Sequence, residues 1–453
     1  MEVQIISKKL IKPSAPTPSH LRNMSLSLMD IRLPPRTESS VFYYSAHGNC
    51  HPDTVEHVER LKRLEKSLSE ILTVYYPLAG RYVEEKLSID CNDEGVEYSE
   101  ALVNGNLSQI LQGQFEVKDL NRFVPDLADE SATSPQVAIQ INIFSCGGIA
   151  IGLRISHRII DAFTSSLFTN GWAKACKVGN INDVIVPNFE AGILFPPRDT
   201  PVVKVPSLSN TTSQIVAKRF VLDTNTISKL KAEVTSSCGG GHMHKTSTTE
   251  VVIAIIWRAQ INAARARYGF LRTSLLCVAI NLRGKTLKKV PENCCGNIYT
   301  VGTARFEADD ETKMGLNGFV DQVRDAIKNT ITEFGKQNED GDGFFSKLIM
   351  KPCIERAEEV RKGEGDVHMF SSLRNVLPFY EVDFGWGKPA WVSLAERPYK
   401  SVMLLDTKAG DGIEAWVTMD KEEMAYFQND PNITMLLKDG DHGVPGNSNL
   451  NVA

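Results

Sequence analysis

Two apolar runs joined by a short turn constrain the fold of this chain more than any other part of its sequence. In the second run, every other residue from Ile149 to Ile155 is a branched apolar residue, and residues 137–143 carry the same alternation. A period of two is typical of a β-strand with one buried face. The turn between the runs, Cys146-Gly-Gly148, contains the glycines of a hairpin turn. The sequence therefore predicts a hairpin with a buried face.

His157 occupies the next position of the alternating series, at the end of the second strand. After it the alternation stops, and the apolar residues between Ile159 and Leu167 fit one face of a helix. A histidine behind an apolar strand is more often structural than catalytic, but His157 and Asp161 also form a His-x-x-x-Asp pattern. Imidazole is the side chain best suited to general base work near neutral pH. At this spacing the carboxylate of Asp161 could orient the imidazole or face elsewhere, and both interpretations stay open.

The composition narrows the class of protein. The chain has 453 residues, of which 42% are hydrophobic, and this is more than one core normally holds, so we expect two domains. The net charge of −5 and the absence of a basic stripe argue against nucleic acid as a partner. Nine cysteines without a Cys-x-x-Cys pair predict reduced thiols, and neither a disulfide framework nor a zinc site. His242 and His244 have no further ligands nearby, so we expect no metal there.

The start of the chain and the length of its apolar runs predict a soluble protein. The residues up to Leu10 lack the apolar length and the cleavage pattern of a signal peptide. No apolar run approaches the ~20 residues that a membrane helix needs. We therefore expect a cytoplasmic protein that does not bind membranes. Without an obvious apolar helix for self-association, we also expect a monomer.

Short strands and amphipathic helices alternate in both halves of the chain, which predicts an α/β fold with mixed sheets. Besides the hairpin, the expected strands are 3–12, 40–44, 87–90, 96–98, 215–222, 275–280, 401–405 and 412–419. Residues 92–95 are expected to join two of them as a second hairpin. The expected helices are 51–72, 161–177, 225–235, 247–268, 312–334, 343–362 and 421–428.

One long segment divides the chain. Residues 178–214 are rich in Pro, Asn, Thr and Ser and show little periodicity, so we interpret them as a crossover between domains. This interpretation gives an N-terminal domain of residues 1–177 and a C-terminal domain of residues 215–437. Residues 438–453 are polar and lack an apolar period, and we expect a disordered tail there.

Several motifs in a fixed order indicate a family. Ser156-His-Arg-Ile-Ile-Asp161, followed much later by Asp383-Phe-Gly-Trp-Gly387, resembles the paired signature of the BAHD family of plant acyl-CoA-dependent acyltransferases. Supporting motifs stand in the family's order at residues 14–18, 76–81, 281–283 and 296–297. The resemblance extends from Lys9 to Met424 and is nearest to the branch that holds vinorine synthase and other alkaloid O-acetyltransferases. It implies two domains of chloramphenicol acetyltransferase-like fold, each a mixed sheet flanked by helices, with the active-site channel between them.

The resemblance also implies a role for each motif. His157 would take the proton of an alcohol while its oxygen attacks the thioester of acyl-CoA, and would then protonate the leaving thiol. Asp161 would pair with an arginine, for which Arg283 is the best candidate, and orientation of His157 is the alternative. The second motif is better suited to a tight loop that supports the site than to catalysis, through Asp383, Gly385, Trp386 and Gly387.

The family further implies an acyl-CoA co-substrate, with acetyl-CoA favoured, and no metal. The free N–H groups of a helix start attract phosphate, and the family places coenzyme contacts near the start of the predicted helix 247–268. The candidates there are Lys245, Ser247 and Thr248, with an ordinary helix cap as the alternative. A small basic loop could meet the 3′-phosphate, but a solvated surface loop is favoured for its members Arg283, Lys285, Lys288 and Lys289.

We therefore expect an enzyme, an acyltransferase of the class that transfers groups other than aminoacyl groups, which acetylates a hydroxyl of a plant specialised metabolite. An alkaloid is the favoured acceptor, and acylation of sugars or of aliphatic or terpenoid alcohols is the alternative. A hydrolase with Ser166 or a cysteine as nucleophile belongs to another class, and the chain lacks the Gly-x-Ser-x-Gly elbow that would favour it. A non-catalytic binding protein would not need His157 and Asp161. The expected partners are the alcohol and acyl-CoA.

Overall fold

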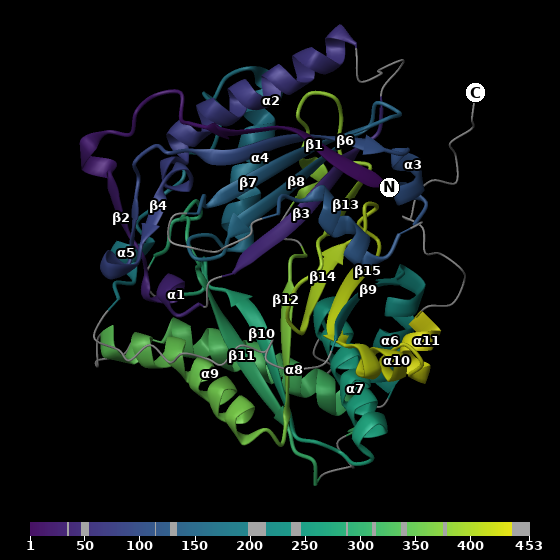
Figure 1. Ribbon diagram of the computed structural model, residues 1–453. Helices are drawn as coiled ribbons and strands as arrows, with labels where there is room; N and C mark the ends of the chain where they lie inside the picture. Colours follow the sequence, from purple (N-terminus) through teal and green to yellow (C-terminus); the bar gives the residue numbers. More distant parts are fainter. Residues whose placement is uncertain are drawn as a thin grey trace.

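The computed structural model describes residues 1–33, 36–46, 54–113, 115–126, 134–197, 214–236, 246–286, 289–309, 314–336, 342–374 and 378–436. Within these residues the strands form two six-stranded mixed sheets and one three-stranded sheet. Helices cover the outer face of each large sheet (Figure 1). The fold class predicted from the sequence, α/β with mixed sheets, is confirmed.

The first sheet contains the predicted hairpin. β7 (Val137–Phe144) and β8 (Ile149–Ser156) pair antiparallel, and Gly147 takes a φ of 80° in the turn between them. The buried second face of β7 packs against η4 (Val117–Phe123). In sheet order the strands are β1 (Glu2–Ile11), β6 (Val96–Asn104), β7, β8, β3 (Thr37–Tyr44) and β13 (Trp391–Leu394), with only the β6–β7 pair parallel among them.

The second sheet comes from the later part of the chain. Its parallel pairs are β10–β12 and β12–β14, and its other neighbours are antiparallel. Its strands in order are β11 (Tyr299–Phe306), β10 (Ser274–Asn281), β12 (Asp366–Ser372), β14 (Ser401–Asp406), β15 (Ile413–Asp420) and β9 (Ile215–Leu222). The sequence did not predict β11 and β12, because few of their residues are fully buried and their alternation is weak.

The expected second hairpin, with its turn at residues 92–95, is wrong. β5 (Ser88–Asp90) pairs with β2 (Asn23–Ser25) and β4 (Arg81–Val83) in the small sheet, whereas the next strand, β6, joins the first sheet. A residue distant in the sequence contacts the turn at residues 92–95. The Asp93 carboxylate accepts hydrogen bonds from the N–H and the hydroxyl of Thr17, at 2.9 and 2.6 Å. The strand pairing and this contact both join residues distant in the sequence, which the local pattern does not contain.

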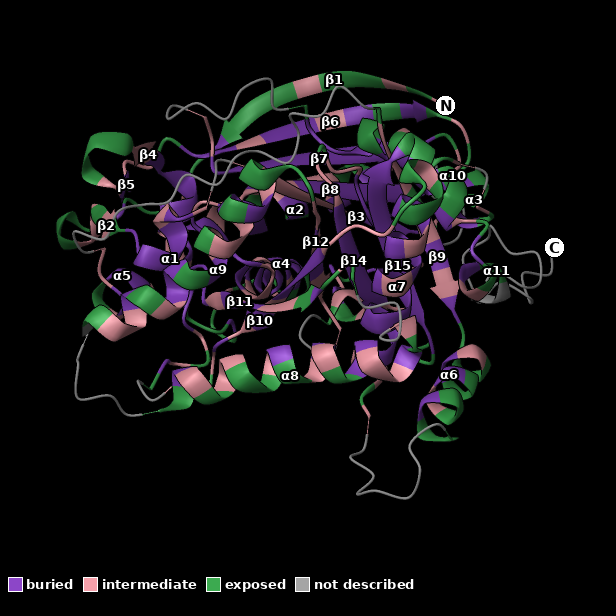
Figure 2. Ribbon diagram, turned by 90° about the horizontal axis from the view of Figure 1, so that it is seen from below, coloured by how far each residue is buried: buried purple, intermediate pink, exposed green. Residues whose placement is uncertain are grey.

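Amphipathic helices bury the outer faces of the two large sheets. α2 (Val55–Val74) and α4 (Ala162–Val178) share a core with the first sheet, and α7 (Thr248–Tyr268) and α8 (Leu316–Gly335) share one with the second. Figure 2 shows buried, intermediate and exposed residues in turn along α8, as expected for a helix with one apolar face. The other helices are α1 (Leu28–Ile31), α3 (Leu107–Leu111), α5 (Ala191–Leu194), α6 (Thr224–Ser236), α9 (Asp342–Lys362), α10 (Lys421–Phe427) and α11 (Pro431–Leu436).

A third core joins the two large sheets face to face. Tyr43 of β3 stacks on Trp391 of β13 with 5.2 Å between ring centroids, and Trp391 stacks on Trp416 of β15 at 6.0 Å. Met403 and Leu405 of β14 belong to the same buried cluster. Aromatic side chains bury large apolar areas and prefer such offset stacks. This cluster therefore binds the inner faces of the two sheets to each other.

β13 lies late in the chain but pairs with β3 of the first sheet, with Trp391 opposite Tyr43. The preceding motif at residues 383–387 also packs against the first half, since the ring of Phe384 contacts Trp172 of α4. The ranges 1–177, 178–214 and 215–437 follow the order of the chain and stay a prediction, while residues 383–394 pack in space with the first half. The expected tail at residues 438–453 lies outside the described residues.

Membrane-spanning helices and metal-binding clusters are both absent from the described residues. No helix there combines the length and the hydropathy that a membrane crossing requires. No group of three or more histidine, cysteine or acidic side chains gathers there to hold a metal ion, and His242 and His244 lie outside this part of the chain. The cysteines that the structure describes as free thiols are Cys91, Cys146, Cys176, Cys277, Cys294, Cys295 and Cys353.

Gly152 of β8 lies directly under η4, and a Cβ atom there would stand 1.9 Å from the carbonyl oxygen of Phe123. The backbone must shift to admit a side chain, so we expect Gly152→Ala to lower the free energy of unfolding by about 1–3 kcal/mol, as overpacking does. Urea denaturation measures this. Gly335→Ala at the end of α8 is the control, because nothing lies within 4 Å of a Cβ there, and alanine favours a helix over glycine. Equal midpoints for the two variants would contradict this packing.

Candidate active site

A cavity of about 160 Å³ lies between the two large sheets, at the end of β8. The first half contributes residues of β3, β8 and the start of α4, and the later part contributes residues of β10, β11, β12 and β14. Much of the wall is apolar and comes from Ile155, Ile160, Phe163, Val301, Met369, Phe379, Leu394 and Met403. The charged and titratable side chains that line it include Arg36, Glu38, His157, Asp161 and Arg397.

Main-chain contacts fix His157 at the end of β8. Its N–H donates to the carbonyl of Arg36 at 2.8 Å, which extends the β3–β8 ladder by one step. Its carbonyl accepts a hydrogen bond from Nδ2 of Asn297 at 2.8 Å. The imidazole lies beside the ring of Tyr299, with 5.9 Å between centroids, and the side chain is only 9% exposed. The strand therefore places the imidazole in the cavity wall.

Burial and, second to it, the guanidinium of Arg36 lower the pKa of His157 from 6.5 to about 4, while the carboxylates of Glu38 and Asp161 act in the opposite direction. At neutral pH the imidazole is therefore uncharged, and one ring nitrogen has a lone pair. A neutral imidazole in a largely apolar cavity can accept a proton from a hydroxyl bound beside it. The geometry thus suits general base chemistry.

Glu38 stands beside His157 on the neighbouring strand β3. Its Oε1 lies 4.0 Å from Nε2 of His157 and accepts a hydrogen bond from the hydroxyl of Tyr399 at 2.9 Å. Arg397 forms an ion pair with Oε2, and Nε of Arg36 lies 3.6 Å from Oε1. Burial raises the pKa of Glu38, but the charges of Arg397 and Arg36 outweigh burial and hold the pKa below its ordinary value. The carboxylate is therefore ionised at neutral pH.

Asp161 is engaged by Arg283, the partner predicted from the sequence. Nη1 of Arg283 donates to Oδ2 at 2.7 Å and Nη2 donates to Oδ1 at 3.2 Å, and the two side chains are 5% and 9% exposed. The N–H of Ile298 donates to Oδ2 as well, at 3.1 Å. Among the described residues no hydrogen bond joins Asp161 to His157. The contacts therefore correspond to the pairing interpretation and not to the orienting one.

The same ion pair connects α4 to the loop after β10. Asp161 is the N-cap of α4, and its Oδ1 accepts hydrogen bonds from the N–H and the hydroxyl of Thr164, both at 2.9 Å. Arg283 also donates to the carbonyls of Cys294, at 2.9 and 3.0 Å, and of Gly296, at 3.2 Å. One buried guanidinium therefore joins a helix start from the first half to a loop from the second.

Asn297 connects His157 to a buried carboxylate. Its Nδ2 donates both to the carbonyl of His157 and to Oδ1 of Asp30, at 2.8 Å each, and its N–H donates to Oδ1 of Asp30 at 2.9 Å. Burial raises the pKa of Asp30, and its hydrogen bonds from Ser27 and Asn297 oppose this. The sequence marked residues 296–297 only as part of the family pattern, and no signal marked Asp30.

The segment Asp383–Gly387 forms a closed loop, and none of its residues lines the cavity. Oδ1 of Asp383 accepts hydrogen bonds from the N–H groups of Gly385 and Gly387, at 2.8 and 2.9 Å, and Oδ2 accepts one from Nζ of Lys177 at 2.6 Å. Both glycines have φ near 100°, at 105° and 100°, a region that favours glycine. Trp386 is buried beside them. These contacts suit the structural role expected for the loop.

Of the expected coenzyme residues, Ser247 and Thr248 do not line this cavity. Ser247 caps α7 in a capping box with Glu250, and the hydroxyl of Thr248 accepts a hydrogen bond from Nζ of Lys231 at 2.6 Å. The helix cap, which was the alternative, is thus present, and a coenzyme contact there stays a prediction. Lys245 lies outside the described residues. In the basic loop Arg283 is buried in its ion pair, Lys285 and Lys289 are exposed, and Lys288 also lies outside the described residues.

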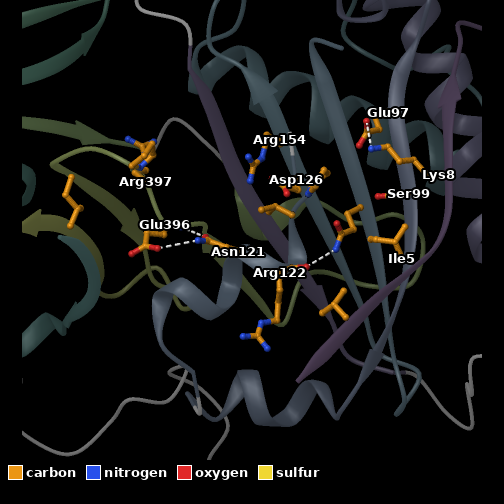
Figure 3. A pocket seen from close by; sticks show the side chains of 16 residues that line it. Ile5, Lys8, Glu97, Ser99, Asn121, Arg122, Asp126, Arg154, Glu396 and Arg397 are labelled. Atoms are coloured by element: carbon orange, nitrogen blue, oxygen red, sulfur yellow. Dashed lines mark hydrogen bonds and ion pairs between the residues drawn. The ribbon is translucent and has the colours of Figure 1, made fainter. Parts of the chain in front are cut away.

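A larger cavity of about 810 Å³ shares Arg397 with the first one. Figure 3 shows its polar lining, with Glu396 and Arg397 on the segment after β13 and Arg154 on β8. Glu396 and Asn121 are hydrogen-bonded to each other on this wall, with the Glu396 N–H donating to Oδ1 at 2.8 Å. Charged side chains therefore line much of this larger cavity, whereas the cavity beside His157 is mostly apolar. Arg397 lines both cavities.

Sequence reasoning missed Arg36, Glu38 and Arg397. The arginine that pairs with Glu38 lies on a loop far along the chain, so no local pattern joins the two. One signal was present, because Glu38 precedes Ser40, Phe42 and Tyr44 in the alternating series of β3, and Phe42 and Tyr44 belong to the core. A charged residue on an otherwise apolar face of a strand could have marked this position.

Comparisons with known proteins match nearly the whole chain. The model of the Transferase family matches residues 1–434. Acetyl-CoA-benzylalcohol acetyltransferase of Clarkia breweri is 34% identical over 438 residues, which cover 94% of this chain and 98% of that protein. Stemmadenine O-acetyltransferase of Catharanthus roseus is 33% identical over 437 residues, covering 95% and 97%. The crystal structure of vinorine synthase superimposes with a TM-score of 0.78 at 30% identity and covers 98% of this chain and 100% of that one.

The ion pair of Asp161 and Arg283 predicts coupled stability effects. Asp161→Asn and Arg283→Met should each lower the free energy of unfolding by about 3–5 kcal/mol, because each leaves a buried charge or polar group without its partner. The double variant should lose less than the sum of the two single losses. Urea denaturation of the three variants measures this. Glu59→Gln, in an exposed pair with Lys62, is the control and should change stability by under about 1 kcal/mol. Additive losses in the double variant would contradict the coupling.

Proposed function

The chain belongs to the Transferase family, the BAHD acyltransferases that its motifs resemble, and we propose that it moves an acetyl group from acetyl-CoA to a hydroxyl of a plant specialised metabolite. His157 is the general base. The proposal rests chiefly on one observation, a neutral, buried imidazole in the wall of a largely apolar cavity between the two sheets. We take residues 1–177 and 215–437 as the two domains on either side of this cavity, with residues 178–214 as the crossover.

The reaction needs one proton acceptor and no covalent enzyme intermediate. His157 takes the hydroxyl proton as the alcohol oxygen attacks the thioester carbonyl. The tetrahedral intermediate then collapses, the carbon–sulfur bond breaks, and the proton passes from His157 to the departing thiolate. Asp161 does not touch the reacting atoms in this scheme. It holds Arg283, and the pair supports the backbone around His157 through the segment 294–297.

The lining of the cavity favours an acceptor with an apolar body. Branched, aromatic and methionine side chains supply much of its wall, and such surfaces bind rings and aliphatic frameworks by excluding water. Stemmadenine O-acetyltransferase and vinorine synthase, similar in sequence and structure, support an alkaloid acceptor. An aliphatic or terpenoid alcohol or a sugar ester is the alternative within the same chemistry, and Acetyl-CoA-benzylalcohol acetyltransferase shows by its name that an aromatic alcohol fits a relative.

Coenzyme A is expected to lie with its phosphates near the start of α7. The N–H groups of the first turn of a helix favour phosphate, and Ser247, Thr248 and Lys245 are the residues proposed. Basic side chains near this helix start support the assignment, since Arg324 donates to the Thr246 hydroxyl at 3.1 Å and Lys231 donates to Thr248. The free thiols of the described cysteines suit a reducing compartment, which supports the proposed cytoplasmic location, and we propose a monomer.

Acyl transfer is tested with purified protein by following the release of free thiol from a panel of acyl-CoA donors. The acceptors are hydroxylated alkaloids, aromatic, aliphatic and terpenoid alcohols, and partially acylated sugars. We expect acetyl-CoA to be the best donor and an alkaloid alcohol the best acceptor. Thiol release without any acceptor, together with a gain in protein mass equal to the acyl group, would contradict direct transfer. Such a result would favour a hydrolase with a serine or cysteine nucleophile.

His157→Ala should lower kcat/KM by about 10²–10⁴-fold, the usual contribution of a general base, while the thermal transition stays close to that of the wild type. Thiol release at saturating acetyl-CoA measures the rate. His20→Ala is the control, because His20 is exposed on a 3₁₀ turn near the N-terminus, and it should keep the wild-type rate. A folded His157→Ala protein with more than about a tenth of the wild-type rate would refute the role of His157.

The low pKa of His157 predicts the acid limit of activity. Since the neutral imidazole is the reactive form, kcat/KM should stay level from neutral pH down to about pH 5 and fall as the pH drops through about 4. The free energy of unfolding should also decrease as the pH falls. In the unfolded chain His157 binds a proton near its ordinary pKa of 6.5, whereas in the folded protein it binds one only near pH 4. Protonation of His157 therefore favours the unfolded chain as the pH falls from 6.5 to about 4. Activity recovered on return to pH 7 separates titration from unfolding. An acid limb near pH 6.5 would contradict the buried environment.

A further inference from the structure

We propose that Glu38 is a positioning residue for acyl transfer, whose carboxylate stabilises the protonated imidazole of His157. The proposal rests on the proposed function, because it assigns a partner to the base named there. The His-x-x-x-Asp motif suggests that Asp161 could serve His157 in this way. The carboxylate that faces Nε2 of His157, however, belongs to another strand and to no motif.

The register of β3 and β8 brings Glu38 to His157. The strands pair antiparallel with Glu38 opposite Ile155, and the N–H of His157 continues the ladder to the carbonyl of Arg36. Side chains that alternate along paired strands share a face. Glu38, Ile155 and His157 therefore project from the same face of the sheet, and Oε1 of Glu38 lies 4.0 Å from Nε2 of His157. The side chain of Glu38 is 27% exposed and lines the cavity.

Asp161 is poorly placed to stabilise a protonated His157. Its two oxygens already accept hydrogen bonds from Arg283, from the N–H and hydroxyl of Thr164, and from the N–H of Ile298. An ionised carboxylate has about four lone-pair sites, and these donors occupy them. Asp161 also raises the pKa of His157, but less than Glu38 does.

Glu38, by contrast, is held rigidly with its charge beside the cavity. The Tyr399 hydroxyl fixes Oε1 at 2.9 Å, and Arg397 is paired with Oε2. Oε1, the oxygen nearer to His157, is 3.6 Å from Nε of Arg36. A fixed carboxylate stabilises a charge that appears during the reaction without having to reorganise at that moment. A carboxylate on the surface that lies near a histidine by chance would lack these fixed contacts.

The charges around His157 explain why a partner is needed. Transfer of the proton makes an imidazolium in a buried site where burial and Arg36 both disfavour it. Opposite charge within about 4–6 Å is what offsets such a penalty. The charged and titratable groups that face His157 and Glu38 come from β3 and the residue before it, the residue before α4, β11 and the segment after β13. They are Arg36, Glu38, Asp161, Tyr299, Arg397 and Tyr399. Of the two carboxylates among them, Glu38 is the one facing Nε2.

Two substitutions that should shift the acid limb of the pH profile in opposite directions test the proposal. Glu38→Gln keeps the shape of the side chain and removes its charge, so it should lower kcat/KM at pH 7 by about tenfold or more and move the acid limb of the pH profile to lower pH. Arg397→Gln removes the charge that competes for Glu38, so it should move the acid limb to higher pH by about one unit. The same shifts should appear when the imidazole of His157 is titrated by NMR in protein with ¹³C-labelled histidine, a readout that does not depend on activity.

The outcomes separate positioning from other roles. Glu38→Asp, which keeps the charge on a shorter arm, should recover part of the rate, and Glu59→Gln on the exposed face of α2 should leave rate and pH profile unchanged. Shifts of the same sign in Glu38→Gln and Arg397→Gln would overturn the proposal, as would a Glu38→Gln protein with the wild-type rate and limb. A rise in the KM for the acceptor with an unmoved His157 titration would instead make Glu38 a binding residue and also overturn it.

Failure of this inference is distinguishable from failure of the proposed function. If His157→Ala is inactive and Glu38→Gln behaves like the wild type, only the role of Glu38 is wrong. If the wild-type protein transfers no acyl group from any donor, the proposed function is wrong. The NMR titration then still reports whether the carboxylate of Glu38 raises the pKa of His157, and an unchanged His157 pKa in Glu38→Gln overturns the electrostatic contact itself.

Discussion

The buried ion pair of Asp161 and Arg283 is the contact on which the geometry of the site depends. A guanidinium and a carboxylate that are this deeply buried are unfavourable alone, so each fixes the position of the other. Asp161 begins α4 in the first half of the chain, and Arg283 follows β10 in the second. The pair therefore holds two distant segments together beside the cavity. Through the carbonyls that Arg283 binds, it also fixes the loop from which Asn297 reaches the backbone of His157.

The carboxylates of Asp161 and Glu38 both lie near His157, but their surroundings differ. Asp161 has its oxygens filled by donors from its own helix start and from the other half of the chain. Glu38 has one oxygen paired with Arg397 and the other beside the cavity and His157. In the proposed mechanism, the same side-chain chemistry thus gives structural support at one position and an electrostatic partner for His157 at the other. The motif that draws attention to Asp161 in the sequence marks the structural one.

Much of this fold could be predicted from the sequence, because period and composition are local properties. The alternation from Ile149 to Ile155 gave the central hairpin and the position of His157. What could not be predicted depends on contacts between distant residues. The weakly patterned strands β11 and β12 become strands only because β10 and β14 lie beside them, and the turn at Asp93 is set by Thr17. The ion pair of Arg283 was reached through a family resemblance, whereas no local pattern joins Glu38 to Arg397, which lies far along the chain.

The late strand β13 has a consequence for how this protein is made. Residues 391–394 complete the first sheet by pairing with β3, which belongs to residues 37–44. While the chain leaves the ribosome, the edge of β3 therefore stays without its partner until most of the protein has been synthesised. An uncovered, apolar strand edge is a site where chains associate wrongly, and pairings that close such long loops form slowly. The first half can collapse early, but its sheet is finished only after residues 391–394 have been translated.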